Sequence, residues 1–240
     1  SGNANAGILV SNPSATNTLI EGNVIGLNAA GTATVGNGGA GVAITSTGAN
    51  HRVLSNSISG NTGLGIDLGD DGATANNGAT SSSVAGQGVD YPVLSQANLV
   101  GTTLTLAGYV GSAPGQATFA NARVEFFLAD GSGSGKTYLG FLTTDANGNY
   151  SGSLTVAGVV DTDQITATAT LSSVGTSEFA TAFNVNATPT DIAPNIFTVA
   201  ENTDTTGGYT VGTLATTDPD SGDTFTYSIT GGTDAAKFSI

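Results

Sequence analysis

The chain has 240 residues, a formal net charge of −14, 36 glycines, and no cysteine, methionine or tryptophan. The excess of Asp and Glu repels phosphate backbones and anionic lipid headgroups, so it disfavours nucleic acids and membrane surfaces as partners and favours cations. Without cysteine no disulfide can stabilise the chain, which must rely on stacked repeats, packed sheets or a metal. The richness in Gly, Asn, Ser and Thr predicts turns and β structure and argues against long helices.

Neither end of the sequence has the features of a processing or membrane segment. No basic stretch followed by an apolar stretch begins at Ser1, and no apolar run reaches the roughly 18 residues that a membrane helix needs. At the other end an alternating apolar pattern continues through Phe238-Ser239-Ile240. We therefore interpret the chain as an internal fragment of a longer protein.

A glycine followed by an apolar-x-apolar phrase recurs near the N-terminus. It occurs at Gly7–Val10, Gly41–Ile44 and Gly65–Leu68, so the intervals are 41 − 7 = 34 and 65 − 41 = 24 residues. A second alternating phrase lies in each interval, at Leu19–Ile25 and Val53–Asn61. Short strands separated by Asn and Gly corners at such a period predict the coils of a β solenoid.

Stacking of these coils predicts which side chains lie inside. Alternate apolar residues of both phrases should be buried between parallel layers, and Asn side chains can form ladders at the corners. The ten extra residues of the first interval, 27–36, should project as a loop or short hairpin. The expected inward residues are Ile8, Val10, Ile20, Ile25, Val42, Ile44, Val53, Ile58, Ile66 and Leu68.

Three of these phrases carry a resemblance to a known group of proteins. Asn23–Gly26, Gly36–Val42 and Ser59–Leu68 resemble the right-handed parallel β-helix repeats of large bacterial surface and secreted proteins. The resemblance implies that residues 1–88 are the C-terminal coils of such a β-helix with its cap.

Beyond a polar stretch the pattern changes to that of antiparallel strands. Seven short candidate strands with turn signals between them predict a β-sandwich over residues 89–187. The clearest hairpin turn is Asp145–Asn149, where Gly148 can adopt positive φ. The candidate strands are Pro92–Val100, Thr103–Val110, Arg123–Ala129, Tyr138–Thr144, Tyr150–Val156, Gln164–Thr170 and Glu178–Val185.

This second stretch also resembles a known module. Val124–Phe127, Tyr138–Gly140, Thr144–Gly148 and Ile165–Ala169 are similar to phrases of the Ig-like sandwich that follows the solenoid in other β-helix surface proteins. The resemblance implies a spacer or stalk module and no chemistry.

The third stretch, residues 188–240, resembles the first half of a cadherin repeat. A linker of small residues with Pro189, at Asn186–Thr190, comes before the similar phrases, which follow in the order of that family. They are Phe197-x-Val199-x-Glu201-Asn202, Val211–Leu214, Asp218-Pro219-Asp220, Phe225–Ile229 and Phe238-x-Ile240. The resemblance implies a truncated cadherin-like domain.

The strongest chemical signal lies in this third stretch. Asp218, Asp220 and Asp223 are closely spaced around a glycine turn, and Glu201 lies upstream; several carboxylate oxygens on short loops are what Ca²⁺ requires. The cadherin resemblance implies that Glu201, Asp218 and Asp220 bind Ca²⁺, while Asp191 matches the interdomain Asp of that family loosely. Asp223 stands where the family often has a carbonyl or Asn donor. The simpler alternative is a solvated acidic turn.

A second acidic group, Asp67, Asp70 and Asp71, follows the last recognisable coil. It could bind calcium, but acids that cap the end of a β-helix explain it equally well.

Catalytic residues are sparse. The one histidine, His51, lies at a coil corner beside Arg52 with no second His or Cys to complete a zinc site or a nucleophile and base pair, so we expect an exposed corner residue. Glycosidase chemistry needs two facing carboxylates, and Glu21 and Asp67 cannot be placed on one face from the sequence. Parallel β-helices do include polysaccharide lyases and glycosidases, so an accessory region of a carbohydrate-active enzyme is the alternative function.

Together these observations predict an all-β fragment of a large bacterial cell-surface or secreted protein, located outside the cell. It would act as an adhesive or structural stalk with a calcium-stabilised cadherin-like junction, and it would not be an enzyme. The expected partners are other cell-surface proteins or glycans, with no nucleic acid and no insertion into a membrane.

Overall fold

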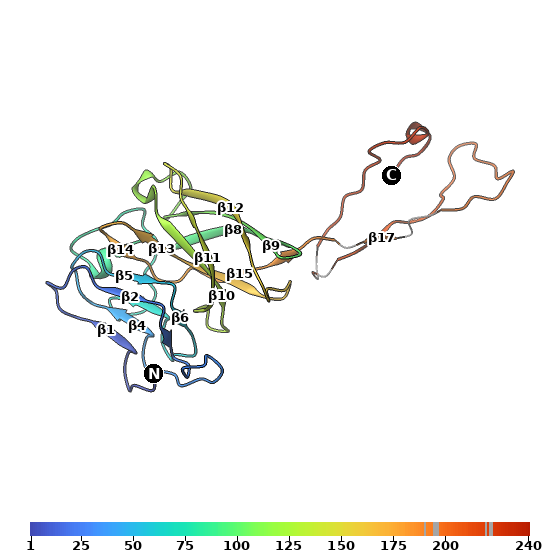
Figure 1. Cartoon of the computed structure of the whole chain (residues 1–240). Coiled ribbons are helices and arrows are strands. Elements are labelled where there is room, and N and C mark those ends of the chain that lie inside the picture. The colour runs from blue at the N-terminus through green and yellow to red at the C-terminus, as the bar shows by residue number, and fades with distance from the viewer. Residues whose placement is uncertain (190, 194–196, 219, 221–222) are drawn as a thin grey trace. The chain divides into compact units, whose positions relative to one another are not determined.

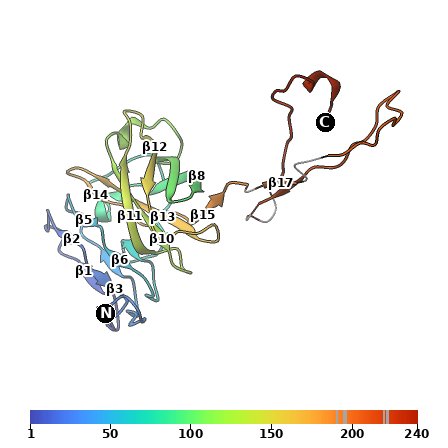
Figure 2. The same cartoon turned by 45° about the vertical axis from the view of Figure 1, so that its right-hand side comes forward.

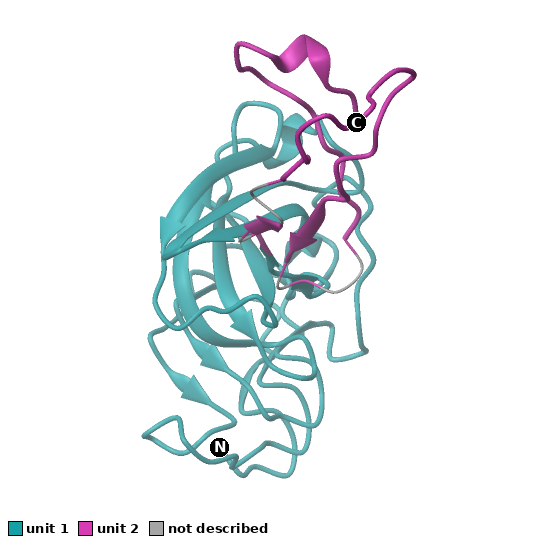
Figure 3. Cartoon of the chain, turned by 90° about the vertical axis from the view of Figure 1, so that its right-hand side faces the viewer, with its two compact units in different colours: residues 1–186 teal, residues 187–240 magenta. Residues whose placement is uncertain are grey.

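A computed structural model describes residues 1–189, 191–193, 197–218, 220 and 223–240. The fold is all-β, and the chain divides into two compact units, residues 1–186 and 187–240 (Figure 3). The first two predicted stretches, 1–88 and 89–187, lie within unit 1 except for residue 187. Each unit is described by itself.

The N-terminal part of unit 1 consists of short parallel strands in successive layers, and several of them lie side by side in Figures 1 and 2. Ile8 pairs with Val42, and Val42 pairs with Ile66, so the three glycine phrases occupy equivalent positions in successive layers. The parallel pairing predicted from the repeated phrases is therefore present. The pairs are β1 (Ile8–Val10) with β4 (Val42–Ile44) and β4 with β7 (Ile66–Leu68), β2 (Leu19–Glu21) with β5 (Arg52–Leu54), and β3 (Val24–Ile25) with β6 (Ser57–Ile58).

The expected inward residues form a core of their own. Ile8 is half-buried and packs against the cluster formed by the other nine, which are all buried. Glycine at the start of each phrase allows the layers to approach closely, because a Cβ atom on Gly41 would lie 2.6 Å from the carbonyl oxygen of Gly65. The buried residues are Val10, Ile20, Ile25, Val42, Ile44, Val53, Ile58, Ile66 and Leu68.

Polar side chains continue from layer to layer at the corners. Asn37 donates from Nδ2 to Oδ1 of Asn61 at 2.7 Å, and its own Oδ1 accepts the backbone N–H of Asn3 at 3.1 Å. The extra residues of the first interval form the predicted projection, closed by an antiparallel bridge between Leu27 and Thr34. The corner ladder and the projecting hairpin are thus both observed.

The remainder of unit 1 consists of two antiparallel sheets. In strand order, one sheet contains β12 (Asn149–Thr155), β9 (Thr103–Val110), β8 (Pro92–Val100) and β16 (Asn186–Ala187). The other sheet contains β11 (Gly135–Thr143), β10 (Arg123–Ala129), β13 (Gln164–Leu171) and β14 (Gly175–Thr176). Strand β15 (Phe183–Asn184) is also paired to β13. Two short 3-10 helices, Ala85–Gly88 and Ala117–Phe119, lie in the connections. Six of the seven predicted strands agree with the structure to within three residues at each end.

The seventh predicted strand, Glu178–Val185, is wrong. The segment contains only the short β15, and β14 precedes it. The residues between them stay attached to β13 through isolated hydrogen bonds, such as the one from Ala180 N–H to the Ala167 carbonyl at 2.8 Å. Glu178 and Phe179 leave the regular ladder because their side chains contact the parallel layers.

The predicted hairpin at Asp145–Asn149 is also wrong, although the turn itself is present. Gly148 has a φ of 74°, and Asp145 Oδ1 accepts the backbone N–H groups of Asn147 and Asn149. The flanking strands β11 and β12 belong to different sheets. The turn therefore carries the chain from one sheet to the other.

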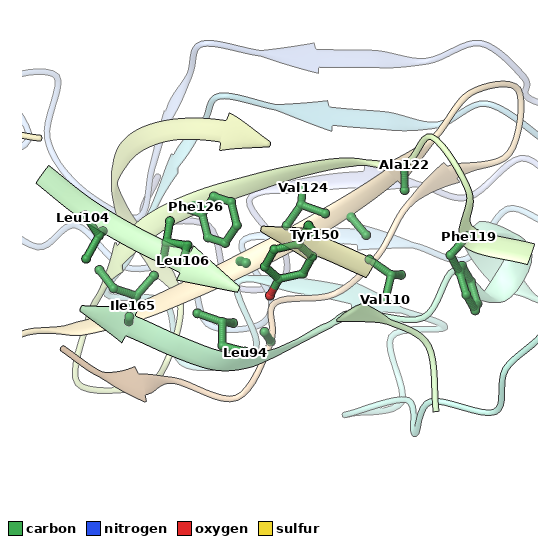
Figure 4. Close-up of a cluster of buried hydrophobic side chains, with 14 of the residues drawn as sticks. Leu94, Leu104, Leu106, Val110, Phe119, Ala122, Val124, Phe126, Tyr150 and Ile165 are labelled. Atoms are coloured by element: carbon green, nitrogen blue, oxygen red, sulfur yellow. The ribbon is translucent and has the colours of Figure 1, made fainter. Parts of the chain in front are cut away.

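Both antiparallel sheets contribute to one buried core (Figure 4). Leu104, Leu106 and Tyr150 come from one sheet and Phe126 and Ile165 from the other. The rings of Phe126 and Tyr150 meet edge to face, with centroids 5.5 Å apart. This arrangement is consistent with the β-sandwich class.

Unit 2 contains little regular structure. Strand β17 (Asp191–Ala193) pairs antiparallel with β18 (Ala215–Thr217), and a 3-10 turn spans Ala235–Lys237. Among its described residues none is buried. Its larger apolar side chains are accordingly exposed, including Ile192, Phe197, Val199, Tyr209, Phe225, Ile229, Phe238 and Ile240.

Candidate calcium site and a carboxylate junction

Three aspartates of unit 2 converge shortly after β18. One carboxylate oxygen from each of Asp218, Asp220 and Asp223 lies within 4.8 Å of the others. Asp218 Oδ1 accepts the backbone N–H of Asp220 at 2.8 Å, and Asp220 Oδ2 accepts that of Ala187 at 2.6 Å. Asp218 Oδ2 is shielded from solvent and has no hydrogen-bond partner among the described residues.

This arrangement fits a hard cation. Carboxylate oxygens are the preferred ligands of Ca²⁺, and a shielded oxygen without a donor is available for coordination. Of the predicted ligands the structure brings Asp218 and Asp220 together and adds Asp223. Glu201 is exposed and lies outside this group, as does Asp191, whose Oδ1 accepts the backbone N–H of Ile192. Pro219 of the predicted motif lies outside the described residues.

A different set of acidic residues joins the two parts of unit 1. The last parallel layer presents backbone N–H groups that no further layer accepts, and side chains of the antiparallel part accept four of them. Thr176 Oγ1 accepts Val53 N–H at 3.0 Å, Glu125 Oε2 accepts Ser55 N–H at 2.8 Å, Asp130 Oδ2 accepts Gly60 N–H at 3.1 Å, and Glu178 Oε1 accepts Leu68 N–H at 2.9 Å. We call the four acceptors, Thr176 and the three carboxylates of Glu125, Asp130 and Glu178, the carboxylate junction.

Glu125 is the most deeply buried acid of the junction, with 0% of its surface exposed. Its carboxylate also accepts the Ser55 hydroxyl at 3.2 Å and Arg123 Nε at 2.9 Å. Arg123 in turn donates to the Tyr138 hydroxyl and lies 3.5 Å above the centre of the Phe141 ring. The buried charge is therefore paired and hydrogen-bonded, as a charge removed from water requires.

The environment shifts the pKa values of the other two acids of the junction, Glu178 and Asp130, in opposite directions. Burial raises the pKa of Glu178 above 4.5, and the nearby Asp67 charge adds to this, despite the N–H donors of Thr74 and Leu68. Burial alone would also raise the pKa of Asp130, but hydrogen bonds from the Ser132 side chain and from the backbone of Gly60 and Ser132 together lower it below 3.8.

The second acidic group of the sequence caps a turn. Asp67 is buried, and its carboxylate accepts the backbone N–H groups of Asp71 and Gly72. Burial raises the pKa of Asp67, and the charge of Asp70 contributes in the same direction. This agrees with the interpretation that these acids cap the end of the parallel layers.

The expectation that His51 is exposed is wrong, because only 1% of its surface is accessible. Its backbone carbonyl accepts the Thr176 N–H, so β14 covers the corner where it lies. His51 Nε2 is 3.1 Å from Ser46 Oγ, and burial lowers the pKa of the ring. Ser46 Oγ also lies 3.3 Å from the carbonyl of Ala15. Protein encloses the pair, since 1% of the His51 surface and none of the Ser46 surface is accessible.

No model of a known protein family matches the chain. Among solved structures, the chain is similar to the adhesin domain of Epf from Streptococcus pyogenes, with 14% identity and a TM-score of 0.33. The match covers 42% of this chain and 34% of that one, so it spans about a third of the other chain's length. A match of this size says nothing about function.

Within the described part of the chain, no helix combines the length and the apolar character needed to span a membrane.

Proposed function

We propose that the chain is an adhesive and structural stalk segment of a large bacterial cell-surface or secreted protein, located outside the cell and without catalytic activity of its own. The observation that carries this proposal is the carboxylate junction. It closes one end of the parallel layers with side chains of the antiparallel part, three of the four of them buried, so that unit 1 should resist load as one body.

The parallel layers support the β-helix interpretation of residues 1–88. Each layer repeats a glycine phrase in register, its apolar side chains share one core, and Asn ladders run along the corners. Stacked layers of this kind form extended, quasi-one-dimensional structures, which suit a stalk.

The strand order supports the Ig-like interpretation of residues 89–187. In chain order, the first, second and fifth long strands, β8, β9 and β12, share one sheet, and β10, β11, β13 and β15 share the other. An Ig-like fold places its A, B, E and D strands in one sheet and its C, F and G strands in the other. Here β8, β9 and β12 stand in the places of A, B and E, and β10, β13 and β15 in those of C, F and G, whereas the fourth strand, β11, pairs with β10 in the second sheet. Such modules commonly act as spacers, which agrees with the proposed stalk.

In residues 188–240 we propose a partial cadherin-like domain that binds Ca²⁺ through Asp218, Asp220 and Asp223. The convergence of three carboxylates and the donor-free oxygen of Asp218 support this assignment. Bound calcium would remove the mutual repulsion of the carboxylates and stiffen the segment that carries them.

Mechanical unfolding tests the stalk role. The chain would be pulled in optical tweezers from handles at residues 1 and 186. We expect one cooperative unfolding event, and the double variant Glu125→Gln with Glu178→Gln should unfold in two steps. If the parallel layers of the unchanged chain unfolded first, in a separate step at low force, the stalk role would be contradicted.

Attachment tests the adhesive role. Beads carrying the chain would be washed over epithelial and bacterial cell layers, with beads carrying an unrelated protein of equal negative charge as the control. Retention no greater than that of the control beads would remove adhesion from the proposal.

A further inference from the structure

Unit 1 contains a cleft where the parallel layers meet the antiparallel sheets. It has a volume of about 350 Å³. Its walls come from three segments, Leu64–Ile66, Gly131–Ser134 and Glu178–Ala182, together with Ala73, Tyr91 and Gln164. None of these residues belongs to the candidate calcium site.

The walls of the cleft are fixed by contacts outside it. The Phe179 ring lies between two glycines, because a Cβ atom on Gly65 would approach the ring to 2.6 Å and one on Gly135 to 2.5 Å. Phe127 holds the same ring edge to face, at 5.4 Å between centroids. Asp130 accepts the backbone N–H groups of Ser132 and Ser134, both at 2.9 Å, and so fixes the second wall. A ligand would therefore meet a preformed site and lose little affinity to reorganisation.

The charge of the cleft excludes anionic ligands. None of the four Lys and Arg residues of the chain lines it. The one ionisable acid in the wall, Glu178, already accepts the backbone N–H groups of Leu68 and Thr74. Because no Lys or Arg lines the cleft and the chain has a net charge of −14, an anionic ligand would be repelled.

The remaining groups suit a ligand with both hydroxyl groups and apolar C–H faces. Tyr91 and Phe179 are half-buried aromatic residues of the lining, and Gln164 and Thr181 are exposed polar ones. In unit 1, every residue of which is described, the hydroxyl groups of Tyr91 and Thr181 have no hydrogen-bond partner, so both are available to a ligand. The volume lies near the lower limit for small-molecule sites, roughly 300 Å³, and accommodates one sugar ring.

We propose that this cleft binds a single hexose unit of a neutral glycan. The inference rests on the proposed adhesive function and names the ligand class through which unit 1 would attach. The ring would lie against the aromatic side chains, and its hydroxyl groups would bond to Tyr91, Gln164 and Thr181.

Binding would be measured on the full ¹⁵N-labelled chain by titration with glucose, galactose, mannose and N-acetylglucosamine, each at millimolar concentrations. We expect saturable amide shifts in the three wall segments with at least one sugar. The variant Thr181→Trp, whose ring would fill the cleft, should lose these shifts. Thr155→Trp introduces the same ring at an exposed position of β12 and should keep them.

Three results would overturn the inference: no shift with any neutral sugar, shifts that persist unchanged in Thr181→Trp, or binding of a lysine-rich peptide in the cleft in place of sugar. The bead assay separates this inference from the proposed function. Attachment without sugar binding removes the cleft and leaves adhesion intact, whereas sugar binding without attachment supports the cleft and removes the adhesive role.

Discussion

Unit 1 and unit 2 have similar alternating apolar sequences but differ in how much of them is buried. In unit 1 the alternating residues form two buried clusters, one between parallel layers and one between antiparallel sheets. In unit 2, Phe197 and Phe225 belong to equally regular alternations, and each remains 38% exposed. Alternation defines an apolar face, but burial also requires a second layer against that face.

The difference has a thermodynamic consequence. Unit 1 obtains its stability from apolar burial and from the carboxylate junction, so changes inside it should be costly. Unit 2 has two paired strands and no buried core among its described residues, so its stability should depend on ligands far more than on any single side chain.

Removal of a core aromatic residue should give the largest contrast between the units. Phe126→Ala deletes a fully buried ring that packs on Tyr150, and should lower the free energy of unfolding of unit 1 by about 3–5 kcal/mol. Phe225→Ala, in unit 2, should change stability by less than about 0.5 kcal/mol. Urea unfolding followed by circular dichroism measures both variants. Similar losses in the two would show that unit 2 also has a packed core.

The carboxylate junction should give the second largest effect. In Glu125→Gln one carboxylate oxygen becomes an amide NH₂ that must face Ser55 or Arg123, both of them donors. We expect a loss of about 1.5–3 kcal/mol, since a hydrogen bond to a buried charged group is removed. Glu21→Gln makes the same chemical change at an exposed position and serves as the control. An unchanged urea midpoint for Glu125→Gln would mean that the junction does not stabilise unit 1.

Much of this organisation could be predicted from local sequence, because it depends on local spacing. The glycine phrases at residues 7, 41 and 65 predicted the parallel register, since the same spacing that makes them repeat also aligns them in the stack. The strands of the antiparallel part were likewise defined by their own alternation and by Gly and Asn at the turns.

The parts that could not be predicted depend on contacts between distant segments. Glu178 lies 110 residues from Leu68, and Glu125 lies 70 residues from Ser55, so nothing near either acid indicates that it caps a backbone N–H. His51 was predicted to be exposed because the strand that covers it, β14, follows more than 120 residues later. At the candidate calcium site, local spacing was enough to group Asp218 with Asp220. The position of Glu201 depends instead on the path of the chain between Glu201 and Asp218.

Calcium should stabilise unit 2 and leave unit 1 unchanged. Ca²⁺ at five times its Kd would add about 1 kcal/mol through binding to the folded state alone, and about 2.7 kcal/mol at 100 times Kd. Extracellular calcium sites typically have Kd values of about 10⁻⁴ to 10⁻³ M, so the smaller figure applies at millimolar ion. The measurement is calorimetric titration with Ca²⁺, together with hydrogen exchange of residues 187–240.

The calcium prediction is tested with two double variants, one in each unit, that remove the same number of negative charges. Asp218→Asn with Asp220→Asn should abolish the heat of binding, and Asp70→Asn with Asp71→Asn, in unit 1, should retain it. Equal heats from both double variants would identify the acidic turn as a solvated loop, and protection that rises equally in both units would show that the ion acts elsewhere.

The smallest effect should come from pH, and its sign should differ between two acids of the junction. The pKa of Asp130 is lowered in the folded chain, so its contribution is present above the unfolded value of about 3.8 and is lost as the pH falls through the lowered folded value. The pKa of Glu178 is raised, so its contribution to stability is fully present below about pH 4.5 and is lost as the pH rises through the raised folded value.

Urea midpoints of unit 1 would therefore be compared between the wild type, Asp130→Asn and Glu178→Gln, from neutral pH to below pH 3.8. Relative to the wild type, Asp130→Asn should lose least at the acid end, and Glu178→Gln should be at its greatest disadvantage at and below about pH 4.5. Each difference should stay within about 1 kcal/mol, because solvent screens the partly exposed Asp130 and amide substitution preserves part of each hydrogen-bond set. Parallel pH profiles for all three proteins would show that neither acid changes its proton affinity on folding, and would reduce the junction to its hydrogen bonds alone.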